Sequence, residues 1–310
     1  MIFHKTKKSL ILTYILIVLL IRILCFRKKL IIVCDQYGRL GNRLHLFAQL
    51  IKFANKNNLA VWMPSFYDYW HFFPNLDQRP TYNCTFYPFT NFISAENIFF
   101  TFNFIFKRVN KFKSNRFFCS LSFHYISNGN PWQIIKESNS LITFFGGFVF
   151  HEFMLNCDSI LTDIKDIFRP AYKYDYDIHK PIMNLRSRND LVCGVLVRQT
   201  DYRSWNDGKY FYTSKQYSIF LDNLKCSFKN RKIGFFIATD EAQDEKLYGD
   251  LDCIIRVGYP LENLYTLSLC DFLIGPPSSY IGWSAFISNK TLRTLLPNSQ
   301  PLLAKDFGYS

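Results

Sequence analysis

The stretch CGVLVRQTDY, residues 193–202, decides the fold. Its first five residues are small or apolar, which is typical of a strand buried on both faces of a parallel sheet. The apolar run ends at Arg198, and a polar segment that contains Asp201 follows. In open α/β sheets, ligands bind outside the carboxyl ends of the strands. We therefore expect Arg198 and Asp201 to lie beside a ligand.

The chain after this stretch alternates short apolar runs with helical patterns. The predicted strands are 193–197, 233–238, 253–257 and 272–274. A capping box at Thr213–Gln216 predicts one helix start, and the acidic pair Asp240–Glu241 predicts another. The remaining predicted helices are 262–269 and 280–287. Such βαβα alternation predicts a doubly wound parallel sheet.

The first half of the chain opens in the order strand, loop, helix, strand. The predicted elements are strands 30–34, 59–63 and 141–145 and helices 43–56 and 150–168. Residues 67–130 are rich in Phe, Tyr and Asn without periodicity, so no element is predicted there. The polar segment 172–189, which contains Pro181, is predicted to be a linker. We therefore expect two doubly wound α/β domains, 30–180 and 190–310, that face a cleft.

The composition is typical of a folded protein with a large core. Hydrophobic residues make up 49% of the 310 residues, and 33 Phe and 19 Tyr favour bulky aromatic packing rather than disorder. The nine cysteines are scattered, with neither a C-x-x-C pair nor the Cys/His spacing of a zinc site. We interpret them as mostly reduced and buried.

The N-terminal segment 1–29 is predicted to be a membrane anchor. Residues 9–26 are uncharged apart from Arg22, and a spanning helix needs at least about 17 apolar residues. Residues 1–30 hold seven basic residues and no acid, within a chain of net charge +13, so the charge favours anionic lipid over nucleic acid. An uncleaved anchor or an interfacial helix is favoured over a cleaved signal peptide because no small-x-small cleavage site follows. Basic residues on both flanks leave the side of the membrane open.

Three polar clusters follow predicted strands, and each suits a phosphate. In GRLGNR, residues 38–43, two glycines let the backbone approach an anion at a helix start. The Arg198 guanidinium can pair bidentately with phosphate oxygens. GPPSS, residues 275–279, brings two hydroxyls to a helix start. Each cluster also has a purely structural explanation: turn formation for the first, an Arg198–Asp201 ion pair for the second, and N-capping of a helix for the third. Together, the clusters predict a site for a phosphorylated ligand.

At these positions the sequence resembles the α1,2-fucosyltransferases of glycosyltransferase family 11. It also resembles their wider superfamily, with the nodulation α1,6-fucosyltransferases and the protein O-fucosyltransferases. The segments that carry the resemblance, in the family's order, are GRLGN at 38–42, the span 146–170, GVLVRQTDY at 194–202, IATDE at 237–241, and GPPSS at 275–279 with Trp283. Two positions depart from the pattern, because Leu196 replaces a His and Gln199 replaces a second Arg.

The resemblance implies a GT-B fold and an inverting, metal-independent transfer of fucose from GDP-fucose to a glycan hydroxyl. Arg198 is then expected to bind the leaving β-phosphate, and Asn42 and Asp201 complete the expected catalytic set. Asp240 is expected in the nucleoside pocket. The expected donor-binding residues are Gly38, Arg39, Gly41, Arg198, Asp240, Ser278 and Ser279. The candidates for the general base are Asp35, Asp201 and Glu152.

Two other functions stay open at this point. The changes at Leu196 and Gln199 are compatible with a catalytically inactive nucleotide- or sugar-binding protein. A GT-B transferase that uses another donor, such as GDP-mannose, is the second alternative. The Asp-x-Asp spellings at 175–177 and 250–252 match those of metal-dependent glycosyltransferases, but both lack a supporting cluster, so no metal is expected. The expected acceptor is a glycan or a lipid-linked glycan near the membrane.

Overall fold

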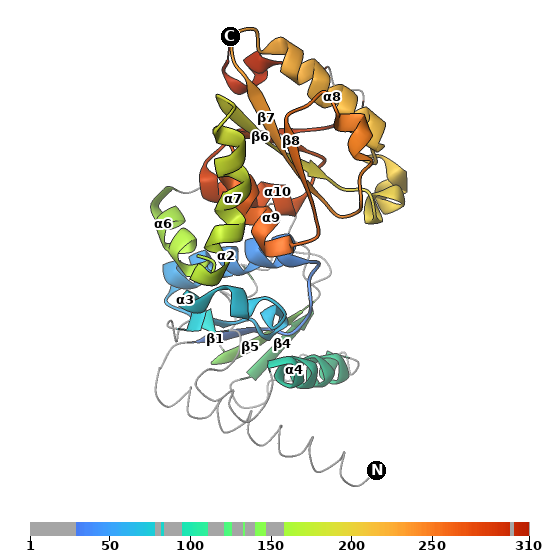
Figure 1. The fold of residues 1–310 in the computed structure, drawn as a ribbon. Helices are drawn as coiled ribbons and strands as arrows, with labels where there is room; N and C mark the ends of the chain where they lie inside the picture. The colour runs from blue at the N-terminus through green and yellow to red at the C-terminus, as the bar shows by residue number, and fades with distance from the viewer. Residues whose placement is uncertain are drawn as a thin grey trace. The chain divides into compact units, whose positions relative to one another are not determined.

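The computed structural model describes residues 29–77, 82–83, 95–110, 121–125, 133, 140–146, 158–297 and 301–309. The chain divides into two compact units, residues 1–169 and 170–310. Each unit contains a five-stranded sheet with helices around it (Figure 1). The predicted α/β class is therefore confirmed.

The sheet of the first unit consists of parallel strands in the order β3-β2-β1-β5-β4. These strands are β1 (Leu30–Val33), β2 (Ala60–Trp62), β3 (Tyr82–Asn83), β4 (Leu121–Tyr125) and β5 (Ile142–Gly146). All four residues of β1 are buried, as expected for the central strand. The predicted strands match β1, β2 and β5, whereas β3 and β4 lie in the aperiodic segment where no element was predicted.

The helices of the first unit pack through aromatic side chains. They are α2 (Leu40–Asn57), α3 (Pro74–Asp77), α4 (Ala95–Asn110) and α6 (Asp158–Ile167), with 3₁₀ turns at Pro64–Phe66 and Trp70–Phe72. Phe47 of α2 packs edge to face on Phe66 and Phe168, with ring centroids 5.5 and 5.7 Å apart. Helix α6 corresponds to the second part of the predicted helix 150–168, and residues 150–157 lie outside the described residues.

The sheet of the second unit is parallel and has the order β10-β9-β6-β7-β8. Its strands are β6 (Leu191–Val197), β7 (Ile233–Thr239), β8 (Cys253–Val257), β9 (Phe272–Gly275) and β10 (Leu292–Thr294). In sequence order this is the 3-2-1-4-5 arrangement of a doubly wound sheet, so the predicted topology of this half is confirmed. The strand order reverses between β6 and β9, and this switch point is where such sheets bind ligands.

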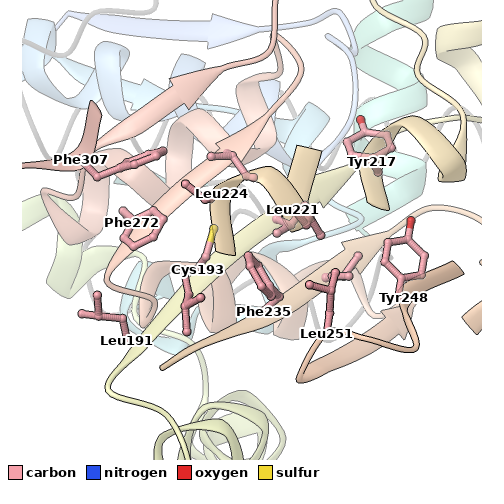
Figure 2. Packing of buried hydrophobic residues seen from close by; sticks show 14 of the residues in the cluster. Leu191, Cys193, Tyr217, Leu221, Leu224, Phe235, Tyr248, Leu251, Phe272 and Phe307 are labelled. Atoms are coloured by element: carbon pink, nitrogen blue, oxygen red, sulfur yellow. The ribbon is translucent and has the colours of Figure 1, made fainter. Parts of the chain in front are cut away.

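One face of this sheet packs against α8 (Ser214–Ser227). The odd-numbered residues of β6, among them Leu191 and Cys193, point to this face, because side chains alternate along a strand. Figure 2 shows Leu191 and Cys193 with Phe235 of β7, Phe272 of β9 and Leu221 of α8. The predicted capping box is confirmed: Thr213 Oγ1 accepts from Gln216 N, and the Gln216 side chain accepts from Thr213 N. The 3₁₀ turns Glu245–Tyr248 and Ala304–Phe307 complete this side.

The opposite face packs against α7 (Asp175–Arg186), α9 (Pro260–Ser268) and α10 (Ser279–Ser288). Val192 and Leu196 of β6 point to this face and belong to one buried cluster with Leu185 of α7 and Ile281 of α10. The unit also has 3₁₀ turns at Tyr172–Tyr174, Asp201–Arg203 and Trp205–Gly208. Both faces are thus covered, which explains why the strands are continuous apolar runs.

The predicted linker 172–189 is wrong, because most of it is helix α7. Ile178, Ile182 and Leu185 are buried at helical spacing. Pro181 within the helix cannot donate to the carbonyl of Asp177 four residues earlier. Arg256 of β8 supplies the missing donor, because its Nη1 lies 2.7 Å from the Asp177 oxygen. This hydrogen bond from a residue distant in sequence stabilises a helix in the segment that the sequence predicted to be a linker.

The helix predicted to start at Asp240–Glu241 is also absent, because these residues follow β7 as a bend and carry no described helix. The Asp240 carboxylate instead accepts from the main-chain N–H of Gln199, at 2.9 Å. Glu241 forms an ion pair with Arg203, at 2.6 Å. Both acids thus bind the loop after β6 rather than the first turn of a helix.

The predicted anchor over residues 9–26 and the candidate base Glu152 lie outside the described residues. Among the helices of the described part, none is both long and apolar enough to cross a membrane.

Candidate functional site

The switch point of the second unit brings together two loops that the sequence singled out. Arg198 follows the last residue of β6, and Pro276–Ser278 follow β9, the neighbouring strand. Tyr202 joins the two loops, because its hydroxyl donates to the Pro277 oxygen at 2.5 Å. Burial raises the pKa of Tyr202, which keeps its hydroxyl protonated as a donor. Residues about eighty positions apart thus form one polar edge of the sheet.

Arg198 is the central cation of this edge, and its side chain is only 14% exposed. Its Nη2 donates to both carboxylate oxygens of Asp201, at 2.6 and 2.7 Å. Its Nε lies 3.1 Å from Asp240 Oδ2 as an ion pair, yet that N–H makes no hydrogen bond to any described residue. The guanidinium also lies 5.0 Å from the ring centre of Tyr202. The structure therefore holds Arg198 in place and leaves part of its donor capacity unused.

The protonation of Arg198 is secure. Burial lowers its pKa, but the hydrogen bond and charge of Asp201, with the charges of Tyr202 and Asp240, outweigh that effect and raise the pKa overall. The residue is a fixed cation at every working pH. Asp201 is the more exposed partner of the pair, since 42% of its side chain is exposed.

Asp240 holds the loop that carries Arg198. Besides the N–H of Gln199, its carboxylate accepts from the Thr200 hydroxyl at 2.7 Å. These contacts occupy both of its oxygens, so the described geometry gives Asp240 a positioning role. Its predicted place in a nucleoside pocket stays a prediction.

Ser278 and Ser279 lie at the start of α10. Ser278 is the N-cap, and its hydroxyl accepts from the Tyr280 N–H at 3.3 Å, so the N-capping explanation holds for this hydroxyl. Ser279 is the first helical residue. The N-terminus of a helix attracts anions through its N–H groups and dipole. Burial raises the pKa of Tyr280, the residue after Ser279, and the charges of Arg256 and Arg198 oppose that rise.

The two departures from the resemblance are both buried. Leu196 is 3% exposed and belongs to the core under α10. Gln199 is also 3% exposed, and its amide donates to the Tyr212 oxygen at 2.9 Å and accepts from Gln243 at 2.8 Å. The uncharged residues thus belong to the interior of this unit, where an unpaired cation would be costly.

The first unit holds the other cluster in the turn before α2. Gly38 has φ +57°, and a side chain there would collide with the amide of Asn42, so the turn requires glycine. Arg39 is the exposed N-cap residue of α2 and makes no side-chain cap, whereas Gly41 is buried in the first turn. Gly38, Arg39, Gly41 and Asn42 therefore lie together as the sequence predicted.

Arg43, from the same predicted cluster, has a structural role. It is 4% exposed and donates to the oxygens of Gly38, at 3.1 Å, and Ser65, at 2.8 Å. It also forms an ion pair with Asp68 at 2.9 Å. Asp35, the candidate base of this unit, accepts from the Asn103 amide at 3.0 Å. Asp68 lies in the aperiodic segment, so no sequence signal could have found this partner.

The described residues contain no group of three or more His, Cys, Asp or Glu side chains that could hold a metal ion. Cys193 and Cys270 are buried, and burial raises the pKa of each thiol, so neither is a reactive thiolate at neutral pH.

Comparison with known proteins gives a likeness of fold. No protein-family model and no curated protein sequence matches the chain. The GDP complex of a point mutant of Arabidopsis thaliana FUT1 matches with TM-score 0.59 and 11% identity, over 88% of this chain and 71% of that one. NodZ α-1,6-fucosyltransferase soaked with GDP-fucose matches with TM-score 0.50 and 16% identity, over 84% and 93% of the two chains. NodZ co-crystallised with GDP also matches with TM-score 0.50. The chain shares its α/β fold with these fucosyltransferases.

Proposed function

We propose that this protein is a glycosyltransferase that transfers fucose from GDP-fucose to a glycan hydroxyl. The observation that carries the proposal is the position of Arg198, a buried cation at the switch point of a doubly wound sheet. It lies in the unit where α10 also presents its N-terminus after the neighbouring strand. A fixed guanidinium and a helix start are both suited to bind the oxygens of a diphosphate.

The fold and the motifs support the same donor. The solved structures that match the fold include fucosyltransferases with GDP or GDP-fucose bound. The segments 38–42, 194–202 and 275–279 resemble the motifs of this superfamily. The proposal extends to the GT-B class and to a role for Asn42 in binding the donor phosphate or the acceptor. The α1,2 linkage of glycosyltransferase family 11 is one outcome that product analysis would identify.

The chemistry follows from the charges. An acceptor hydroxyl attacks the anomeric carbon of fucose on the face opposite the phosphate, which inverts that centre. The bond from this carbon to the β-phosphate oxygen breaks, and its electron pair stays on the phosphate. Negative charge therefore grows on GDP, and Arg198 with the start of α10 stabilises it. This stabilisation replaces the metal that other glycosyltransferases use, so we propose a metal-independent reaction.

The proton of the acceptor hydroxyl needs a carboxylate. Asp201 is paired with Arg198 in the unliganded protein. A phosphate that takes over the guanidinium releases the Asp201 carboxylate, which is already 42% exposed. Asp201 is therefore our first candidate for the general base, ahead of Asp35, which is held by Asn103.

We further propose that residues 9–26 anchor the protein to a membrane, so that its acceptor is a glycan or a lipid-linked glycan near that surface. The uncharged length and the flanking basic residues of this segment support the proposal.

Turnover of a donor panel tests the proposed function. The full-length protein is incubated with GDP-fucose, GDP-mannose, UDP-galactose and ADP-glucose, and release of nucleotide is measured with EDTA and with Mg²⁺. We expect GDP release from GDP-fucose alone, equal in both conditions, and a product of inverted anomeric configuration by NMR. Nucleotide release from another donor supports the alternative of a GT-B transferase that does not use GDP-fucose. GDP binding without release supports the inactive alternative that Leu196 and Gln199 suggested.

A further inference from the structure

The loop after Arg198 carries an exposed aromatic surface that the phosphate site does not explain. Trp205 lies between two tyrosines, with ring centroids 4.9 Å from Tyr202 and 5.5 Å from Tyr210. Tyr202 is buried, but Trp205 is 46% exposed. Tryptophan is highly buried on average, so an exposed indole within an ordered aromatic row calls for a function.

The row begins at the phosphate-binding candidate itself. The Arg198 guanidinium lies 5.0 Å from the Tyr202 ring centre, and Tyr202 is in turn 4.9 Å from Trp205. Tyr202 is also fixed at its far end, because its hydroxyl donates to the oxygen of Pro277. The Tyr202 ring therefore lies between the Trp205 indole and the cation that would bind the leaving phosphate.

The backbone of the loop is shaped to present this row. Asn206, Asp207 and Gly208 have φ of 52°, 57° and 71°, three successive left-handed residues. Apart from glycine, asparagine and aspartate are the residues that adopt this conformation most readily, so the sequence suits the turn. At Gly208 a side chain would also press on the Arg203 oxygen. Such backbone conformations cluster at ligand-binding sites.

We propose that Trp205, with the half-buried Tyr210 beside it and the buried Tyr202 supporting it, is the platform on which a pyranose ring of the acceptor glycan stacks. This inference rests on the proposed function. The C–H bonds on one face of a pyranose carry slight positive charge and pack on the electron-rich face of an indole. Asp201 and Asp207 on the same loop provide carboxylates that accept from sugar hydroxyls.

The geometry favours the acceptor sugar over the nucleobase. The three rings are tilted by 40° and 33° at the two contacts, so they form a corrugated surface rather than one flat face. The donor sugar is bonded to the phosphate at Arg198, and the acceptor lies one ring farther along the row.

Glycan binding by the full-length protein tests this platform. The probe is an array of immobilised glycans with terminal galactose, glucose, mannose or N-acetylglucosamine, in the presence of GDP. The variants are Trp205→Ala and Trp205→Phe, with Tyr172→Ala as the control because Tyr172 is an 88% exposed aromatic residue outside the loop. GDP affinity is measured for each variant by calorimetry, which also reports whether the second unit is folded.

We expect the wild type and Tyr172→Ala to bind at least one glycan class equally. Trp205→Ala should bind that glycan at least tenfold more weakly than the wild type, and Trp205→Phe should show a smaller loss. The GDP affinity of both variants should stay within twofold of the wild-type value. Glycan binding that Trp205→Ala retains, or its absence in the wild type, overturns the proposal. A tenfold loss of GDP affinity in Trp205→Ala overturns it in favour of nucleobase stacking. Failure of the proposed function itself is distinct, because the donor panel would then show no release of GDP from GDP-fucose by the wild type.

Discussion

Replacing Asp201 by Asn should strengthen GDP binding, although Asp201 belongs to the candidate catalytic set. In the unliganded protein both Asp201 oxygens accept from Arg198 Nη2, at 2.6 and 2.7 Å. A phosphate that pairs with Nη2 competes with this carboxylate for the guanidinium. Asp201 is 42% exposed, and a pair with one such partner contributes about 1 kcal/mol. Removing the competitor should therefore tighten the GDP dissociation constant roughly fivefold.

The assay is calorimetric titration of GDP into the full-length wild type and Asp201→Asn at low and at moderate salt. Asp250→Asn is the matched control, because it removes one negative charge from the opposite edge of the same sheet, before β8. The control should bind GDP like the wild type. If Asp201 is also the general base, turnover of GDP-fucose falls in Asp201→Asn while binding improves. Weaker GDP binding by Asp201→Asn would refute the reasoning and make Asp201 the residue that orients Arg198.

Two further predictions concern stability. Arg256→Met should lower the free energy of unfolding by about 3 kcal/mol, because it removes the donor to the buried side chains of Asn263 and Thr266 and to the Asp177 carbonyl. Urea denaturation measures this, and a loss below about 1 kcal/mol contradicts the prediction. The second prediction concerns Asp252, whose pKa is lowered by the hydrogen bond from Arg188. A lowered pKa means that the ionised carboxylate stabilises the fold, so the wild type should be more stable than Asp252→Asn at neutral pH. This difference in the free energy of unfolding should disappear as the pH falls below about 4 and the carboxylate is protonated. An advantage that persists at pH 2.5 contradicts the second prediction.

The sequence predicted the second sheet well because its strands are buried on both faces. The strand β6 is apolar at every position, and all seven of its residues are buried. The capping box at Thr213 was predictable for a similar reason, since both partners lie within four residues. Arg198 could be placed at the carboxyl edge of the sheet because it directly follows such a strand, and its role in ligand binding stays a prediction.

The failures have a common physical cause, which is a partner distant in sequence. Pro181 and the polar residues around it suggested a linker, but Arg256 satisfies the carbonyl that the proline leaves without a donor. Arg43 looked like a ligand-binding cation, but Asp68 and two main-chain oxygens hold it in the interior. Asp240 looked like a helix start, although its carboxylate binds a loop about forty residues earlier.

Trp205 was overlooked for a different reason. It is one of five tryptophans in a chain with many aromatic residues, and the sequence does not distinguish an exposed ring from one in the core. Only the described contacts show that Tyr202 and Tyr210 flank it and that it is 46% exposed.

The most direct test of the central claim is GDP binding by full-length Arg198→Ala, measured by calorimetry in EDTA. Arg188→Ala is the control, because Arg188 also pairs with an aspartate but lies before β6 rather than after it. Two lost charge-assisted hydrogen bonds of about 1.5 kcal/mol each predict roughly a hundredfold weaker GDP binding by Arg198→Ala. The account predicts that the wild type and Arg188→Ala bind GDP in preference to UDP and ADP. Wild-type affinity in Arg198→Ala, or GDP binding that requires a metal, would contradict it.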